Sequence, residues 1–122
     1  MVTLLSAFVP LFFIMAGEIV ILCTCASEEE ASKISTHLLE ERLAACVSVF
    51  PVGRSYYWWK GAIESSAEHL LLIKSSESLF SAVEKAVRKI HSYEVPELLA
   101  LQVTDGSADY LNWLRTNLRG DS

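Results

Sequence analysis

The chain has 122 residues, with 15 Asp and Glu against 10 Lys and Arg, which gives a net charge of -5 at pH 7. A chain of this length forms one domain and should bury roughly two-thirds of its unfolded surface, enough for an ordinary core without disulfide bonds. An acidic protein lacks the positive surface that binds phosphate backbones, so the composition argues against nucleic-acid binding.

The first 17 residues form an apolar segment without Lys or Arg. Its length suits a signal peptide better than a membrane span of about 20 residues, but a basic n-region is missing, and a cut after Ala16 would need a small residue where Ile14 stands. We expect residues 1–17 to be a hydrophobic extension without a stable membrane span, followed by one domain over residues 18–120. The alternatives are an exported leader and a true translation start at Met15.

The next segment predicts a strand followed by a helix. Glu18–Thr24 is a short, β-branched apolar run, which indicates a strand buried on both faces. Ser27 and Glu30 have the spacing of a capping box, in which the hydroxyl accepts from a free helical N–H and the carboxylate reaches back. Apolar residues at spacings of three and four then predict a helix to about Ala45.

A second strand is predicted at Cys46–Pro51, with a bulge or bend near Gly53 before pairing resumes at Ser55. The following stretch, SYYWWKGAIESSAEHLLLIKSS, indicates two long strands folded about a turn. That turn lies either at Lys60–Gly61 or at residues 64–66, and the sequence does not decide between them.

A second helix, capped by Ser75 or Ser76, is predicted to end at about His91. Leu98–Val103 predicts a fourth strand, and a turn at Asp105–Gly106 leads into a short last helix. The order β, α, β, β, α, β with a terminal helix is the split βαβ arrangement of the ferredoxin-like α+β class. In this class a four-stranded antiparallel sheet carries two helices on one face.

The predicted strands are apolar on both faces. Because successive side chains alternate across a strand, Tyr56 and Trp58 point to one face while Tyr57 and Trp59 point to the other. Two helices cover only one face, so a monomer would expose a large apolar patch, and such patches usually mark association. We expect an oligomer, unless the last helix or the N-terminal segment folds over the second face.

Enzyme motifs are missing from the sequence: it has no GxSxG elbow, no Gly-rich phosphate loop and no HExxH. We therefore expect no catalytic residue and a non-enzymatic function. His37 and His69 are expected to be surface or packing residues. His91 is the candidate for chemistry because a helix C-terminus favours its charged form, with a capping role as the alternative.

Three cysteines cannot all pair within the chain, and their spacing is typical of neither a zinc motif nor a disulfide framework, which favours a reducing, cytoplasmic location. Cys23 ends the first predicted strand and Cys46 begins the second. If these strands are parallel neighbours, their thiols lie near opposite ends of the pair. Thiolates with a histidine suit Cu(I) or zinc, but a site here would need groups from different subunits or separate weak sites. Each cysteine is otherwise a core residue.

Several stretches of residues 18–119 have a recognisable pattern: VILCTC, LAAC, SYYWWKG and HSYEVPE. Together they resemble the CutA family of divalent-cation-tolerance proteins. The resemblance implies a ferredoxin-like subunit in a tight homotrimer, similar to the PII signalling proteins, with long hairpins paired between subunits. It also implies a role in tolerance of copper and other divalent metals, with zinc or another divalent cation as the alternative ligand.

The resemblance further assigns site residues. It implies metal ligands at Cys23, Cys46 and His91, and Ile90 stands where family members often carry a second histidine. It also implies clefts between subunits, for which the candidate lining residues are Trp59, Tyr93, Glu97 and Trp113. A PII-like sensor of a small ligand in these clefts and a trimeric scaffold for a partner protein are the alternative functions.

Overall fold

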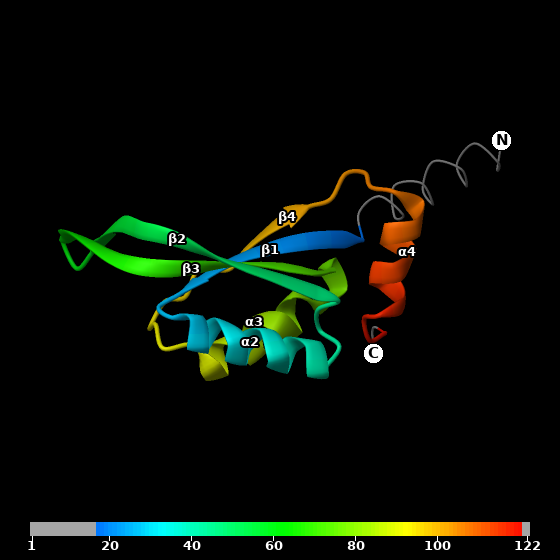
Figure 1. Ribbon diagram of the computed structural model, residues 1–122, viewed down its shortest axis with the longest axis horizontal. Coiled ribbons are helices and arrows are strands. Elements are labelled where there is room, and N and C mark those ends of the chain that lie inside the picture. The colour runs from blue at the N-terminus through cyan, green and yellow to red at the C-terminus, as the bar shows by residue number, and fades with distance from the viewer. Residues whose placement is uncertain (1–16, 121–122) are drawn as a thin grey trace.

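The computed structural model describes residues 17–120, so the predicted hydrophobic extension lies outside the described residues except for Gly17. One antiparallel sheet has the strand order β2-β3-β1-β4, with β1 at Glu18–Cys25, β2 at Cys46–Trp59, β3 at Ala62–Ser76 and β4 at Leu99–Gln102. The helices are α2 at Glu28–Glu40, α3 at Phe80–Ile90 after the 3-10 turn η1 at Glu77–Leu79, and α4 at Ala108–Thr116. Helices α2 and α3 lie on one face of the sheet, and α4 stands at its end (Figure 1). The predicted ferredoxin-like α+β class is confirmed.

The predicted adjacency of the first two strands was wrong. β1 and β2 run in the same direction, but β3 lies between them and pairs antiparallel with both. The reason is the tight turn at Lys60–Gly61, whose two residues have φ values of 50° and 83°, as a two-residue hairpin turn requires. This turn puts β3 beside β2, and β1 then pairs with the other edge of β3.

The boundaries of α2 differ from the prediction. Ser27 Oγ accepts from Glu30 N–H at 3.1 Å, as expected, but the Glu30 carboxylate reaches Ala26 N–H at 3.3 Å instead of the capping residue itself. The helix ends at Glu40 and not at Ala45. Arg42 has a φ of 56°, which helical backbone does not allow, so the chain leaves the helix there.

Two other boundaries also change. The predicted irregularity in β2 is confirmed as a register shift between Pro51 and Gly53, but pairing resumes at Gly53 itself rather than at Ser55. Ser75 caps no helix: it is buried in β3, where its hydroxyl donates to Leu43 O at 2.7 Å.

None of the helices within residues 17–120 is long and apolar enough to cross a membrane.

The core lies between the sheet and the two helices. Alternate side chains of β1 and β3 point toward α2 and α3, and the contacting helix side chains recur at three- and four-residue spacing. Its deeply buried members include Ile19, Ile21, Cys23, Leu71 and Ile73 on the sheet and Ile34, Leu38, Val83 and Val87 on the helices. Burial of this apolar stripe is what fixes the two helices to one face.

No helix of residues 17–120 covers the opposite face of the sheet (Figure 1). We call this surface the uncovered face; from the strand register its apolar residues are Val20, Leu22, Cys46, Phe50, Leu70, Leu72, Leu99 and Leu101, and the polar residues Thr24, Ser48 and Lys74 share it. Leu99 and Leu101 are 57% and 52% exposed, and Val20 and Leu22 are only partly buried, so the expectation that both faces of the first strand are buried was wrong for a single chain. The described part of the chain therefore presents the apolar surface that the sequence predicted.

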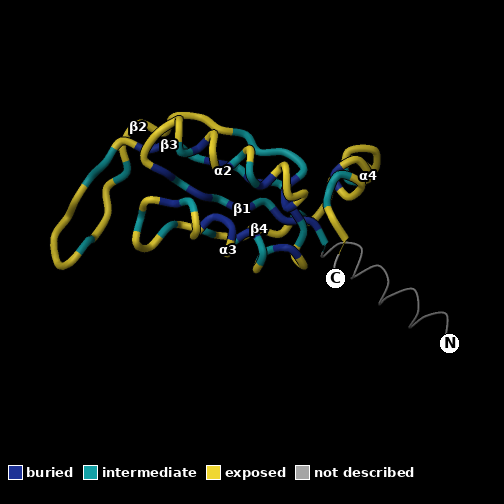
Figure 2. Tube along the Cα trace, turned by 90° about the horizontal axis from the view of Figure 1, so that it is seen from below, coloured by how far each residue is buried: buried dark blue, intermediate teal, exposed yellow. Residues whose placement is uncertain are grey.

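Helix α4 leaves the uncovered face open because it is fixed elsewhere. The Arg115 guanidinium binds the Glu18 carboxylate through two hydrogen bonds, of 2.6 and 3.2 Å, and so ties α4 to the start of β1. Beyond the helices, the β2–β3 hairpin extends past the other strands, and its residues are mostly exposed (Figure 2). Tyr56 and Trp58, on this extension, are 73% and 72% exposed.

Candidate functional site

The first predicted ligand, Cys23, lies in the closed interior. Its side chain is fully buried in the core on the helix side of β1. Burial, with smaller contributions from Cys25 and from the carboxylates of Glu97, Glu30 and Glu68, raises the pKa of the Cys23 thiol to about 12. Metals bind the thiolate, so these surroundings oppose a metal at Cys23.

Cys46 faces the other way. It is the first residue of β2 and pairs with Lys74, and Val47 beside it points into the core, so Cys46 belongs to the uncovered face. The Lys74 ammonium donates to Cys46 Sγ at 3.6 Å and to Ser48 Oγ at 3.1 Å. The sheet itself therefore separates the Cys46 thiol from that of Cys23.

His91 stands at the C-cap position of α3, the alternative considered for it, but only its backbone N–H bonds to the helix, at Val87 O, and its side chain bonds elsewhere. Its Nε2 lies 2.7 Å from Thr24 O, an atom that only accepts, so we infer that Nε2 carries the hydrogen. The backbone N–H of Tyr93 donates to Nδ1 at 3.1 Å, and the Glu30 carboxylate lies 3.7 Å from Nδ1. Both ring nitrogens thus have hydrogen-bond partners, and the imidazole is fully buried.

The three predicted ligands do not meet within one chain. Among residues 17–120, no group of three or more His, Cys, Asp or Glu side chains could hold a metal ion. As they stand, the donors Cys23, Cys46 and His91 do not fit a single metal site. A site that used them would need side chains from different copies of the chain, or separate sites.

A polar cluster lies where the hairpin leaves the sheet. The Tyr93 hydroxyl donates to Glu68 Oε2 at 2.6 Å, and the hydroxyls of Tyr57 and Ser66 are 2.9 Å apart. Burial, reinforced by the bond to Glu68, raises the pKa of Tyr93, and burial with the nearby Glu68 charge raises the pKa of Glu97. We call these five residues the Tyr93 cluster.

Sequence reasoning missed Glu68, the acceptor at the centre of this cluster. Its side chain is nearly buried, at 7% exposure. The available signal was a single carboxylate in the predicted strand, separated by His69 alone from the apolar residues Leu-Leu-Leu-Ile, because buried carboxylates usually have partners.

The other two cleft candidates lie far from Tyr93 and Glu97. Trp59 is at the end of the β2–β3 hairpin, where the Lys60 ammonium is 5.7 Å from its ring centroid. Trp113 is on α4, at the opposite end of the molecule, with its ring centroid 5.5 Å from that of Tyr110 (Figure 1). A cleft that combined all four residues would have to form between copies.

Known proteins match this chain in both sequence and structure. A family model described as CutA1 divalent ion tolerance protein matches residues 19–117. The divalent-cation tolerance protein CutA of Pectobacterium atrosepticum is 45% identical over 105 residues, which are 86% of this chain and 96% of the relative.

Solved structures agree with this match. The CutA1 structure from Thermus thermophilus is 43% identical with a TM-score of 0.82, and a structure described as the periplasmic divalent cation tolerance protein CutA from Archaeoglobus fulgidus is 35% identical with a TM-score of 0.81. Each comparison covers 84% of this chain and 99% of the solved chain. The similarity therefore extends over nearly the whole described domain.

Proposed function

Because the chain belongs to the CutA1 divalent ion tolerance family, we propose that it binds copper, or failing that zinc or another divalent cation, and contributes to metal tolerance without catalysing a reaction. The observation that carries this proposal is the uncovered face. It is apolar enough to require a partner, and it presents a half-buried thiol at Cys46. Metal binding and assembly would then occur on the same surface.

The proposed functional unit is a homotrimer, as the family resemblance implies. Two features support self-association. The uncovered face includes Leu99 and Leu101, which are more than half exposed. The outer edges of β2 and β4 are the ends of the sheet within residues 17–120, and an exposed strand edge is a template for pairing with another chain.

Of the three predicted ligands, we rank Cys46 first. Thiolate sulfur is a soft ligand that suits Cu(I) and zinc. Cys46 is not enclosed in the core, so a second copy could supply further ligands to the same ion. Cys23 would have to lose a buried proton, and His91 would have to give up one of its two hydrogen bonds.

Native mass spectrometry of the reduced chain, with Cu(I) or Zn²⁺ added stepwise, tests both parts of the proposal. We expect a trimer that takes up a whole number of ions, and we expect Cys46→Ser to lose them. Cys23→Ser is the matched control, because it removes the same atom from the closed side of the sheet. A trimer that binds neither metal would reject the metal-binding part, and a monomer would reject the assembly.

A second candidate function rests on the Tyr93 cluster. The carboxyl groups of Glu68 and Glu97 interact, and burial together with the Glu68 charge raises the pKa of Glu97. Carboxyl groups with raised pKa values are typical of binding sites. We propose as the alternative that Tyr93 and Glu97 line a cleft between copies that senses a small ligand. A thermal-shift screen tests this: hits should disappear in Glu97→Gln and persist in Glu94→Gln, whereas a screen without hits would reject it.

We further propose a cytoplasmic location. Cys23, Cys25 and Cys46 are all unpaired, which supports a reducing compartment. The relative from Archaeoglobus fulgidus is described as periplasmic, so a periplasmic location is the alternative that the experiment has to distinguish. Fractionation of cells that express the chain with and without residues 1–17 should give a cytoplasmic protein in both cases. A periplasmic protein that depends on this segment would reject the location.

A further inference from the structure

The β2–β3 hairpin carries an apolar surface that is separate from the uncovered face. Its end projects beyond the helices and the other strands (Figure 1, Figure 2). Tyr56 pairs with Ser65, and Trp58 pairs with Ile63. Side chains directly opposite each other share a face, and Arg54 shares it too, because its guanidinium donates to Ser65 Oγ at 2.9 Å. We call these five residues the outer hairpin face.

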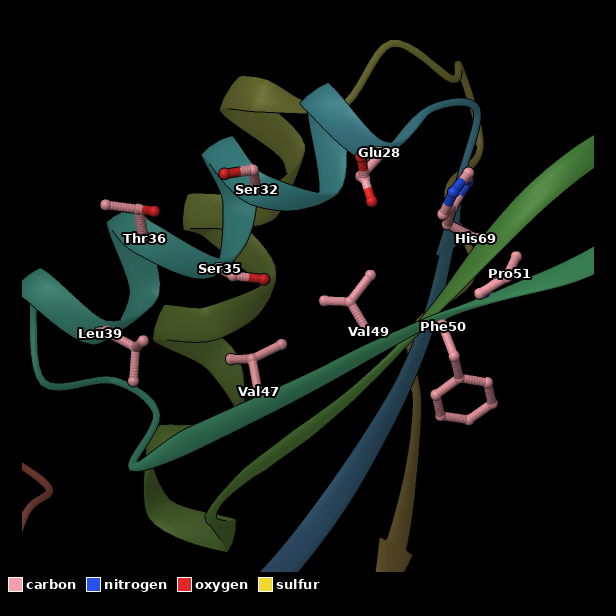
Figure 3. Close-up of a pocket in the computed structure, with 10 residues that line it drawn as sticks. All are labelled: Glu28, Ser32, Ser35, Thr36, Leu39, Val47, Val49, Phe50, Pro51 and His69. Carbon is pink, nitrogen blue, oxygen red and sulfur yellow. The ribbon is translucent and has the colours of Figure 1, made fainter.

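Side chains at the start of β2 alternate between the two sides of the sheet. Val47 and Val49 point toward α2, and Phe50 points away from it (Figure 3). The register shift between Pro51 and Gly53 puts an extra residue into β2 and interrupts this alternation. The side on which the outer hairpin face lies therefore follows from β3, which has no extra residue.

Along β3 the alternation is unbroken. Leu71 is buried in the core, so Ser65 and Ile63, which are six and eight residues before it, lie on the helix side. Tyr57 and Trp59 lie on the other side, in step with the uncovered face. Assembly through the uncovered face therefore leaves the outer hairpin face open, and α2 and α3 do not extend over the end of the hairpin (Figure 1).

The apolar side chains of the outer hairpin face are open to solvent. Tyr56, Trp58 and Ile63 are 73%, 72% and 66% exposed. Tyr and Trp rings combine an apolar body with a polar edge, and they are enriched at membrane–water interfaces. A projecting hairpin can place such rings among lipid headgroups while the body of the domain stays in water (Figure 1).

The charges of the hairpin favour an anionic surface. Arg54 and Lys60 stand at the two ends of the row of apolar residues. Glu64 is the one carboxylate of residues 54–67, and it lies on the opposite side with its pairing partner Tyr57. Because the whole chain has a net charge of -5, an anionic surface attracts this end of the hairpin and repels the rest of the chain. The hairpin is therefore the part that turns toward such a surface.

From these observations we propose that the outer hairpin face binds the surface of a membrane that contains anionic lipids. Trp58 and Ile63 insert among the headgroups, and Arg54 and Lys60 contact lipid phosphates on either side of them. The contact is peripheral and spans no membrane. It uses neither Cys46 nor the Tyr93 cluster, so it does not depend on metal binding.

Sedimentation with sucrose-loaded vesicles measures this binding in the full chain, at low ionic strength because salt screens the attraction. The vesicles are made of phosphatidylcholine, either alone or with about one third phosphatidylglycerol. We expect saturable binding to the anionic vesicles and binding about tenfold or more weaker to phosphatidylcholine alone.

Matched variants test the assigned contacts. Trp58→Ser should weaken binding to the anionic vesicles about fivefold or more, whereas Trp58→Phe should retain most of the binding. Trp113→Ser removes an exposed Trp from α4, at the opposite end of the molecule, and should leave the binding nearly unchanged. Lys60→Gln should weaken the binding about fivefold, and Lys85→Gln, which removes an exposed ammonium from α3, should not.

All these side chains are exposed, so each variant should keep the far-UV circular dichroism of the unmodified chain. The proposal is overturned if the chain does not bind the anionic vesicles, if it binds both kinds of vesicle equally, or if folded Trp58→Ser and Trp113→Ser are weakened equally. Binding that survives both Trp58→Ser and Lys60→Gln would come from another part of the chain, such as residues 1–17, and would overturn it as well. None of these outcomes depends on whether the chain binds copper.

Discussion

Replacing His91 by alanine distinguishes a structural histidine from a metal ligand. The buried imidazole donates to Thr24 O at 2.7 Å and accepts from Tyr93 N–H at 3.1 Å, and His91→Ala removes both bonds. Each leaves a backbone group without its partner inside the protein, at a cost of about 1–3 kcal/mol, and some of this is recovered if water enters. We therefore expect a loss of about 2–4 kcal/mol in the free energy of unfolding.

Urea denaturation followed by tryptophan fluorescence measures this loss, at one fixed protein concentration because assembly would add to stability. His37→Ala on α2 is the control and should cost less than about 0.5 kcal/mol, because no hydrogen bond of comparable burial is lost there. Copper binding per folded subunit should be unchanged in His91→Ala. A loss below about 1 kcal/mol would refute the assigned hydrogen bonds, and lost copper binding at unchanged stability would establish His91 as a ligand.

Three further predictions concern the contact between Glu18 and Arg115, the uncovered face and acid stability. Arg115→Met should lower the free energy of unfolding by about 1–2 kcal/mol, because the nearly buried Glu18 carboxylate loses both hydrogen bonds from the half-exposed Arg115 guanidinium. A double-mutant cycle with Glu18→Gln measures the coupling energy of the two side chains. A coupling energy near zero would contradict this prediction. Leu101→Lys should shift the assembly toward monomers in analytical ultracentrifugation, and an unchanged assembly would show that the uncovered face is not the interface. Burial acts to raise the pKa of Glu30, but hydrogen bonds from Ser92 and Ala26 outweigh burial and lower the pKa in the folded chain. The contribution of ionised Glu30 to the free energy of unfolding is therefore complete above its pKa in the unfolded chain, near about 4.3. That contribution is lost as the pH falls through the lower pKa in the folded chain. Glu30→Gln should therefore flatten the loss of stability on acidification, whereas Glu29→Gln should not.

The fold could be predicted because its signals are local. β-branched runs, the Ser27 hydroxyl cap and apolar residues at helical spacing each act within a few residues, and each produced the predicted element. The positions that were wrong depend on distant contacts. Whether β1 neighbours β2 is decided by where β3 inserts, and the early end of α2 at Glu40 depends on how the following loop reaches β2.

The candidate sites could be predicted less well, for the same reason. Cys23 and Cys46 look alike in sequence, each at the end of an apolar run, yet the pleat of the sheet sends one thiol into the core and the other to the uncovered face. The roles of His91 and Glu68 follow from partners that lie 67 and 25 residues away in the chain. Pairings at such separations leave no periodic signal in the sequence.

The two faces of the sheet also separate the possible functions. On the helix side the chain closes its own core around Cys23 and His91, and the buried side-chain atoms without a hydrogen-bond partner among residues 17–120 are Ser35 Oγ and His69 Nδ1. On the other side Cys46 and the leucines of β4 lie on a surface that the described chain does not cover. Chemistry on the uncovered face must therefore change with assembly. Leu101→Lys should therefore weaken metal binding together with the assembly, whereas a metal site that one folded chain completes alone would keep its affinity in this variant.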